Sequence, residues 1–339
     1  MRRGGTPRIL LALLATLVVT VASVLVYALT PYPLPKEGVI VDIEPGGLRG
    51  VGEQLYAQGL GVHPAGFWLI ARLSGQAGSL KAGRYAFAAG STPWSVVGQM
   101  ARGDVVKVRV TLVEGWRFRD FRAALAAEPG IRNDTLGLDD ASIMAELGQP
   151  GVAAEGRFLP DTYVLSYGSS DRVVLRMAFQ AMQRALDEAW TRRQPDLRLR
   201  SPDEALVLAS IIEKETGVAE ERGIIAGVFH NRLRIGMRLQ TDPTVIYGMG
   251  AAYSGRLRRA DLERDTPWNT YTRAGLPPTP IAMPGRASLL AAVQPDTTRA
   301  LYFVANGHGG HVFSETLEEH NRQVQRWLQA LRQSRGRAN

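Results

Sequence analysis

The hydrophobic pattern sets the N-terminal end of the chain apart from the rest. Ile9 to Leu29 is an uncharged run broken only by Thr16, Thr20 and Ser23. As a helix that rises about 1.5 Å per residue, this run is about 30 Å long, which matches the hydrocarbon core of a bilayer. The pattern therefore predicts one membrane-spanning helix over residues 9–29.

A cleaved signal peptide is the alternative interpretation of this run. Its apolar region would be about 7–15 residues long and would end in a small-residue cleavage site. The run here is longer, and Tyr27-Ala28-Leu29-Thr30-Pro31 is a poor cleavage site. Arg2, Arg3 and Arg8 precede the run and no charge follows it until Lys36. The positive-inside bias thus predicts a single-pass protein with a cytoplasmic tail, residues 1–8, and a body outside the cytoplasm.

Short alternating and helical patterns follow the apolar run. Val39, Val41 and Ile43 alternate as in a strand, and Tyr85 and Phe87 mark a second strand. Amphipathic helices are expected over residues 51–58 and 67–73. A further helix is expected from Pro93, with Ser91 or Thr92 as its cap.

Later segments continue the mixture of strands and helices. Val108, Val110 and Leu112 alternate, residues 118–125 are helical in pattern, and residues 171–190 form a long helix. Tyr302-Phe303-Val304 and Val312-Phe313 flank a glycine-rich turn and predict a hairpin. The expected fold class is α+β, with a small α/β module between the membrane helix and a larger α+β domain.

Ser201 begins the helix that carries the strongest candidate for catalysis. Ser201 is a good cap, Pro202 suits the first position, and Glu204 can close a capping box. At about 100° per residue, Leu208, Ile211 and Ile212 form an apolar stripe. Glu215 falls on the same stripe, whereas Glu213 falls on the opposite side of the helix.

The position of Glu215 suits a general acid. A carboxyl in apolar surroundings has a raised pKa and stays protonated near neutral pH, as proton donation requires. The alternative is a solvated glutamate in the last turn, or one that pairs with Lys214 or Arg222. Spacing alone leaves both interpretations open.

A group of amide, hydroxyl and aromatic side chains follows this helix. Such groups bind the hydroxyl and acetamido groups of sugars, so they are candidate substrate-binding residues: Gln240, Thr241, Asp242, Tyr247, Asn269 and Tyr271. The alternative is turn formation, since Asp242-Pro243 and Gly275-Leu276-Pro277-Pro278 are good turn formers.

Composition excludes several classes of function. With no cysteine, the chain has no disulfide, iron–sulfur cluster or cysteine nucleophile. The formal charge of +8, from 40 Lys and Arg against 32 Asp and Glu, suits a membrane surface or an anionic polymer. Nucleic acid is not expected, because basic residues cluster only in a short C-terminal tail: Arg326, Arg332, Arg335 and Arg337.

No cofactor or metal is expected either. The sequence has no P-loop, dinucleotide-binding glycine motif or Gly-x-Ser-x-Gly elbow. His308, His311 and His320 lack the helical spacing of zinc hydrolases, and the glycines between His308 and His311 favour a hairpin.

Several motifs together resemble a known family. They are Glu213-Lys214-Glu215-Thr216, Leu239-Gln240-Thr241-Asp242-Pro243-Thr244, Asn269-Thr270-Tyr271 and Phe158-Leu159-Pro160-Asp161-Thr162-Tyr163. The chain resembles the MltG (YceG-like) endolytic murein transglycosylases of bacteria, over nearly everything after the apolar run.

The resemblance implies a protein of the bacterial inner membrane with a LysM-like module at residues 38–106 and a catalytic domain at residues 107–335. Glu215 matches the catalytic glutamate of the family. The implied reaction cleaves the MurNAc–GlcNAc bond within peptidoglycan strands, leaves 1,6-anhydroMurNAc ends and limits the length of nascent strands. Peptidoglycan synthases are candidate partners.

Two other functions remain as alternatives. One is a peptidoglycan hydrolase that uses two carboxylates, with Asp242 or Glu213 as the partner of Glu215. The other is a membrane-tethered protein that binds peptidoglycan without cleaving it.

Overall fold

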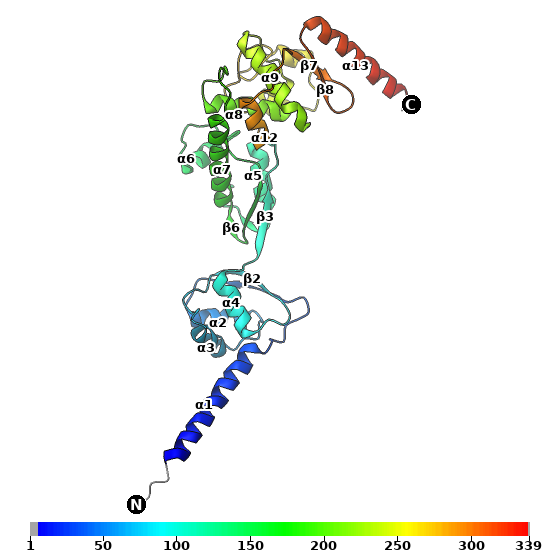
Figure 1. Cartoon of the computed structure of the whole chain (residues 1–339). Helices are drawn as coiled ribbons and strands as arrows, with labels where there is room; N and C mark the ends of the chain where they lie inside the picture. Colours follow the sequence, from blue (N-terminus) through cyan, green and yellow to red (C-terminus); the bar gives the residue numbers. More distant parts are fainter. Residues whose placement is uncertain (1–5, 338–339) are drawn as a thin grey trace, which may run out of the picture. The chain divides into compact units, whose positions relative to one another are not determined.

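The computed structural model describes residues 6–337 and divides into two compact units (Figure 1). The first unit comprises Met1–Arg109 and Val164–Ser169, and the second comprises Val110–Tyr163 and Ser170–Asn339. Arg2, Arg3 and most of the predicted tail over residues 1–8 lie outside the described residues. So do the side chains of three arginines of the basic C-terminal tail, Arg332, Arg335 and Arg337.

The N-terminal apolar run forms helix α1 (Thr6–Leu29), so the predicted helix is confirmed. The stretch Arg8–Leu29, 22 residues long, is apolar and long enough to cross a membrane. Large apolar side chains along it, such as Leu10 and Val19, are exposed in the protein. An exposed apolar helix of this length is suited to a lipid environment.

A small pair of strands and three helices form the rest of the first unit. β1 (Val39–Ile43) and β2 (Gly83–Phe87) are antiparallel, with Val41 opposite Tyr85. α2 (Leu48–Ala57), α3 (Pro64–Leu73) and α4 (Pro93–Arg102) complete the unit. Alternate residues of the strands are buried among the helices, as period-two patterning requires. Thr92 caps α4 as predicted.

The end of α1 belongs to the core of this unit. Ala28 is 4% exposed and Tyr32 is 8% exposed, and both pack into the core that β1, β2 and the three helices share. Val24 and Tyr27 pack against the same core. The apolar helix is therefore continuous with the folded unit at its C-terminal end.

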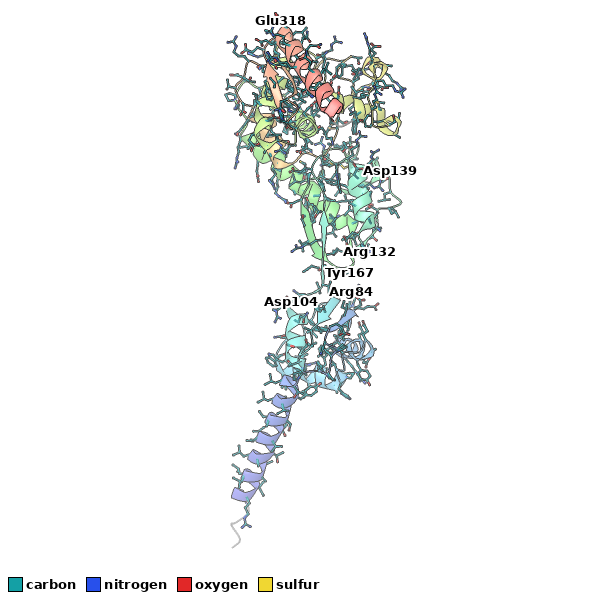
Figure 2. The ribbon with its side chains drawn as sticks, turned by 90° about the vertical axis from the view of Figure 1, so that its right-hand side faces the viewer. Arg84, Asp104, Arg132, Asp139, Tyr167 and Glu318 are labelled. Atoms are coloured by element: carbon teal, nitrogen blue, oxygen red, sulfur yellow. The ribbon has the colours of Figure 1, made fainter. Side chains whose placement is uncertain are left out.

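Residues 164–169 join the first unit through Tyr167. The guanidinium of Arg84 lies 3.8 Å from the centre of the Tyr167 ring, and both side chains are labelled in Figure 2. Arg84 also donates two hydrogen bonds to Asp42, of 2.7 and 2.6 Å. The ion pair and the cation–π contact together hold this returning segment against β2.

Strands in residues 6–337 pair only in twos. β3 (Lys107–Thr111) pairs with β5 (Thr162–Ser166), and this ribbon contributes residues to both units. β4 (Ile131–Arg132) pairs with β6 (Ser169–Ser170). β7 (Tyr302–Ala305) and β8 (His311–Ser314) form the predicted antiparallel hairpin.

Helices dominate the second unit. They are α5 (Phe118–Ala127), α6 (Asp140–Glu146), α7 (Asp171–Thr191), α8 (Pro202–Glu215), α9 (Arg222–Arg234), α10 (Asp242–Met249), α11 (Arg259–Glu263), α12 (Arg286–Val293) and α13 (Leu317–Arg337), with short 3₁₀ turns at Ala219–Glu221 and Gly250–Ala252. The mixed helix-and-strand composition expected from the sequence is confirmed.

α8 is the central helix of the second unit, and its surroundings correct one prediction. Every residue from Ala205 to Ile212 is buried, because α7, α9 and α12 pack around the helix. The expected single apolar stripe is wrong, since α8 has no solvated side along this stretch. Glu213 is consequently also buried, with its side chain 7% exposed, and it accepts a hydrogen bond from the Gly285 N–H at 2.9 Å.

The start of α8 agrees with the sequence except in one detail. Ser201 caps the helix by accepting a hydrogen bond from the Glu204 N–H. Glu204 does not close the capping box. Its carboxylate instead accepts hydrogen bonds from the backbone and the guanidinium of Arg200, at 2.7 and 2.8 Å. The guanidinium offers a charge-assisted bond that a Ser201 N–H does not.

Candidate active site

Glu215 is the last residue of α8, where the helix ends beside a cavity. The next residue, Thr216, is extended, with φ −141° and ψ 138°. Its hydroxyl accepts a hydrogen bond from the Val218 N–H at 2.9 Å, which fixes the turn after the helix. The buried helix α8 therefore places the carboxyl of Glu215 at the edge of the core, beside the cavity.

The cavity has a volume of about 350 Å³. Its walls come from the end of α8, from α9, from the turn before α10, from the hairpin strand β7 and from the start of α13. The residues that line it are Glu215, Arg232, Leu239, Gln240, Thr241, Asp242, Tyr271, Tyr302, Phe303, Leu317 and His320. Four of the six predicted substrate-binding residues, Gln240, Thr241, Asp242 and Tyr271, thus lie around the predicted acid.

Thr241 holds the carboxyl of Glu215 in place. Thr241 is buried, and its hydroxyl donates a hydrogen bond to Oε1 of Glu215. The Thr241 N–H donates to Oγ1 of Thr270 at 3.0 Å, and the Thr241 carbonyl accepts from the Thr244 hydroxyl at 2.8 Å. This network fixes one carboxyl oxygen of Glu215.

Gln240 has a strained backbone at the mouth of the cavity. Its φ is 49°, in the left-handed region that residues other than glycine rarely adopt. Its N–H donates to the Thr270 carbonyl at 3.1 Å, which helps to hold this conformation. The side chain is exposed, and among the described residues no group forms a hydrogen bond with its carboxamide. Strain of this kind concentrates at functional sites.

Tyr271 and Asp242 form a second polar pair in the cavity wall. The Tyr271 hydroxyl donates to Oδ1 of Asp242 at 2.6 Å. Burial and the bond to Asp242 both raise the pKa of Tyr271, so its hydroxyl stays protonated at neutral pH. Asp242 begins α10, where a carboxylate is favoured by the helix dipole.

Asn269 and Tyr247 do not line the cavity. Asn269 is 0% exposed, and its side-chain amide donates to the carbonyls of Leu262 and Arg264 at 3.0 and 2.7 Å. Its side-chain oxygen accepts from the Tyr271 N–H at 2.8 Å. We therefore propose a positioning role for Asn269, which connects two loops and orients Tyr271.

Tyr247 lies in a different environment, on α10. Its ring packs on Trp268, with centroids 5.5 Å apart, and the guanidinium of Arg117 lies 4.8 Å from its centre. Burial raises the pKa of Tyr247 to about 12. These contacts join α10 to the segment before α5.

Burial dominates the electrostatics of Glu215. It raises the pKa of this carboxyl from 4.5 to about 7, against the hydrogen bond from Thr241, which lowers it. The Asp242 carboxylate adds to the rise, whereas His311 and Arg232 oppose it. A carboxyl with this pKa is populated in both protonation states at neutral pH, as a group that first donates and then accepts a proton requires.

Three other side chains of the cavity were not recognised from the sequence. Arg232 is buried, and it donates to the carbonyls of Leu301 and Leu239, each at 2.6 Å. Its guanidinium lies 5.3 Å from the centre of the Tyr302 ring, on which His320 also stacks at 5.2 Å. Burial, and then Arg232, lower the pKa of His320, so it is neutral at pH 7.

His311, one of the histidines considered for a metal, is part of a hydrogen-bond network with Glu221. Its Nδ1 lies 2.7 Å from Oε2 of Glu221, and its N–H donates to Oε1 of the same residue at 2.7 Å. The Thr216 hydroxyl, next to Glu215, also donates to Glu221, at 3.2 Å. The hairpin is thereby tied to the end of α8.

A sequence profile of the YceG-like family matches residues 41–326. The chain belongs to the YceG-like family. The resemblance noted from the motifs is thus confirmed, and the match extends over both compact units.

Relatives of this YceG-like chain include two enzymes with curated names. The endolytic murein transglycosylase of Bacillus subtilis strain 168 is 47% identical over 123 residues, which is 36% of this chain and 34% of that protein. The endolytic murein transglycosylase of Streptococcus pneumoniae serotype 2 is 31% identical over 176 residues, 50% of this chain and 31% of that protein. The chain spans about a third of the length of these relatives.

A solved structure is also similar. The crystal structure of a yceG-like protein from Listeria monocytogenes superposes with a TM-score of 0.55 at 29% sequence identity. The superposition covers 85% of this chain and 99% of the Listeria chain. The fold described above is therefore shared within the family.

Proposed function

We propose that this YceG-like chain is an endolytic murein transglycosylase with Glu215 as its catalytic residue. The observation that carries the proposal is the Glu215 carboxyl, which has a raised pKa and is held by Thr241 in a cavity of polar and aromatic side chains. The names of the relatives in Bacillus subtilis and Streptococcus pneumoniae support the same activity.

The proposed reaction uses Glu215 twice. Glu215 first donates its proton to the oxygen between MurNAc and GlcNAc, and that bond breaks with the electron pair on the departing oxygen. The 6-hydroxyl of the same MurNAc then attacks the electron-deficient C1, and its proton passes to the Glu215 carboxylate. The products are a 1,6-anhydroMurNAc end and a free GlcNAc hydroxyl, with no water consumed. The internal nucleophile makes a second carboxylate unnecessary.

The other cavity residues have supporting roles in this proposal. Thr241 orients the acid, and the free carboxamide of Gln240 contacts the acetamido or hydroxyl groups of the sugar. Asp242 and Tyr271 form the opposite polar wall. Within the cell, cleavage of nascent strands would limit their length, with peptidoglycan synthases as neighbours.

Incubation with purified sacculi tests this function against mere binding. We expect released strands with anhydro ends from the interior of the glycan, and none with Glu215→Gln. A membrane-tethered binding protein would instead sediment with the sacculi and release nothing.

The pKa of Glu215 predicts a pH dependence for both activity and stability. Because the acid must be protonated, kcat/KM should fall tenfold per pH unit above the pKa of Glu215, which is about 7. The folded state also binds this proton more tightly than the unfolded state. Proton binding at Glu215 therefore makes its full contribution to the free energy of unfolding below about pH 4.5. This contribution is lost as pH rises through about 7.

Denaturation measured at several pH values checks the second part. As the pH is raised from 4.5 to 8, the free energy of unfolding of Glu215→Gln should increase relative to that of the wild type by on the order of 1–3 kcal/mol. A difference in stability that does not change with pH would contradict the raised pKa.

Gln240→Ala should reduce turnover with little change in melting temperature. Its side chain is exposed and has no hydrogen-bond partner among the described residues, so the fold loses nothing when it is removed. The loss of one good polar contact should cost about 1–3 kcal/mol in transition-state binding, roughly 5- to 150-fold in kcat/KM. Unchanged kinetics would remove Gln240 from the substrate site.

For the membrane, we propose a single-pass protein of the cytoplasmic membrane with its N-terminus inside and a LysM-like module at residues 38–106. The apolar helix α1 and the arginines before it support this topology. A reporter that is active only outside the cytoplasm should be active when fused after Asn339. Activity of a cytoplasmic reporter at the same position would indicate the opposite topology.

A further inference from the structure

A second cavity, of about 400 Å³, lies in the same unit as the Glu215 cavity. Its lining includes the polar and aromatic side chains of Trp116, Arg117, Arg119, Asp120, Lys214 and Tyr253. None of these residues takes part in the reaction proposed for Glu215.

The two cavities share two walls. Lys214 lines the second cavity and the next residue, Glu215, lines the first. In the same way, Asp242 lines the first cavity and Pro243 the second. Consecutive residues have Cα atoms about 3.8 Å apart, so the end of α8 and the start of α10 separate the two cavities. A polymer held at Glu215 can therefore place its neighbouring groups in the second cavity.

The second cavity carries an excess of positive charge. Its lining includes three cationic residues, Arg117, Arg119 and Lys214, and one acidic residue, Asp120. Asp120 is already engaged, because it accepts from the Arg117 N–H at 3.0 Å and lies 3.5 Å from Nε of Arg119. Among the described residues, Lys214 donates one hydrogen bond, to the Gly115 carbonyl at 3.1 Å, and its ammonium group has further protons to offer.

Aromatic side chains and a fixed loop complete the cavity. The Trp116 ring packs edge-on against Phe121, with centroids 6.2 Å apart. The Gly115 N–H donates to the Met283 carbonyl at 2.9 Å, and the Met283 N–H donates to the Trp116 carbonyl at 2.8 Å. Trp116 and Tyr253 are partly exposed and present apolar surface next to the cations. The cavity is thus formed before any ligand arrives.

We propose that this second cavity binds the peptide substituent of the glycan strand that is cut at Glu215. The proposal rests on the proposed function. Sugars with only hydroxyl and acetamido groups carry no charge for three cations to bind. The peptide on MurNAc carries carboxylates together with short aliphatic side chains, and these match charge-assisted donors beside aromatic surface. The second cavity therefore selects strands that still carry their peptides.

Arg119→Ala tests this selection, with Arg286→Ala as the matched control. Arg119 lies in the first turn of α5, with its side chain 65% exposed and 3.5 Å from Asp120. Arg286 begins α12 with its side chain 58% exposed and 3.6 Å from Glu188. Arg286 does not line the second cavity. Both variants lose one exposed cation and one loose ion pair, so the fold is preserved in each.

Binding and turnover are measured separately, so that the two proposals can fail independently. In a Glu215→Gln background, the Kd is measured for glycan fragments with peptides and for the same fragments stripped by an amidase, with the lactyl carboxylates that the amidase exposes then converted to neutral amides. Arg119→Ala should weaken binding of the peptide-bearing fragments about fivefold and leave the stripped fragments unchanged. In the active background its KM for peptide-bearing strands should rise by the same factor with kcat unchanged.

Two results would overturn the inference: equal weakening for both kinds of fragment, or the same effect from Arg286→Ala. If the active protein cleaves neither substrate but the difference in Kd persists, the inference stands and the proposed activity fails. If both substrates are cleaved and Arg119→Ala changes neither Kd nor KM, the activity stands and the inference fails.

Discussion

Glu215→Gln is expected to reduce cleavage of glycan strands by about 10²-fold or more while the protein stays folded. The amide cannot donate the proton that the departing oxygen needs. Its side-chain oxygen can still accept the hydrogen bond from Thr241, so the shape of the site is kept. The measurement is the rate of release of soluble fragments from purified sacculi, with the melting temperature taken on the same samples.

Glu213→Gln is the matched control, two residues earlier on α8. Its carboxylate accepts from the Gly285 N–H at 2.9 Å and lies 4.0 Å from Arg222. Because the side chain is only 7% exposed, we expect a lower melting temperature with near-normal activity per folded molecule. Equal loss of specific activity in both variants, or full activity in Glu215→Gln, would remove Glu215 from its catalytic role.

Asn269→Ala is expected to lower stability by about 2–4 kcal/mol. The amide of Asn269 bonds the carbonyls of Leu262 and Arg264 and the N–H of Tyr271, and alanine removes all of these bonds. Denaturant unfolding gives the change in free energy. Activity of the molecules that remain folded should fall less than in Gln240→Ala, because Asn269 acts only through Tyr271.

The opposite result would return Asn269 to the substrate site. Reduced turnover with an unchanged melting temperature is the outcome first expected from the sequence, where Asn269 was grouped with Gln240. The two side chains are chemically alike, and only their burial separates a positioning role from a binding role.

Local signals in the sequence predicted the elements that carry the site. Ser201 and Pro202 marked the start of α8. The glycine-rich turn between residues 304 and 312 predicted the β7–β8 hairpin. These features depend on residues close together in the chain, so they can be read without knowledge of tertiary packing.

Tertiary packing decided the features that were not predicted. A helical projection assumes one solvated side, but α7, α9 and α12 surround α8 and bury Glu213 as well as Glu215. Arg232, Tyr302 and His320 gather only because the hairpin and the start of α13 pack beside α9. No local pattern connects residues so far apart in the chain.

The mass of the product ends, formed in water labelled with heavy oxygen, tests the central claim most directly. If the 6-hydroxyl of MurNAc attacks C1 of the same sugar, the product ends are one water lighter than reducing ends and contain no heavy oxygen. Our account predicts this result for the wild-type chain. Reducing ends that carry the heavy isotope would show that water attacks, as in a two-carboxylate hydrolase, and would contradict catalysis by Glu215 alone.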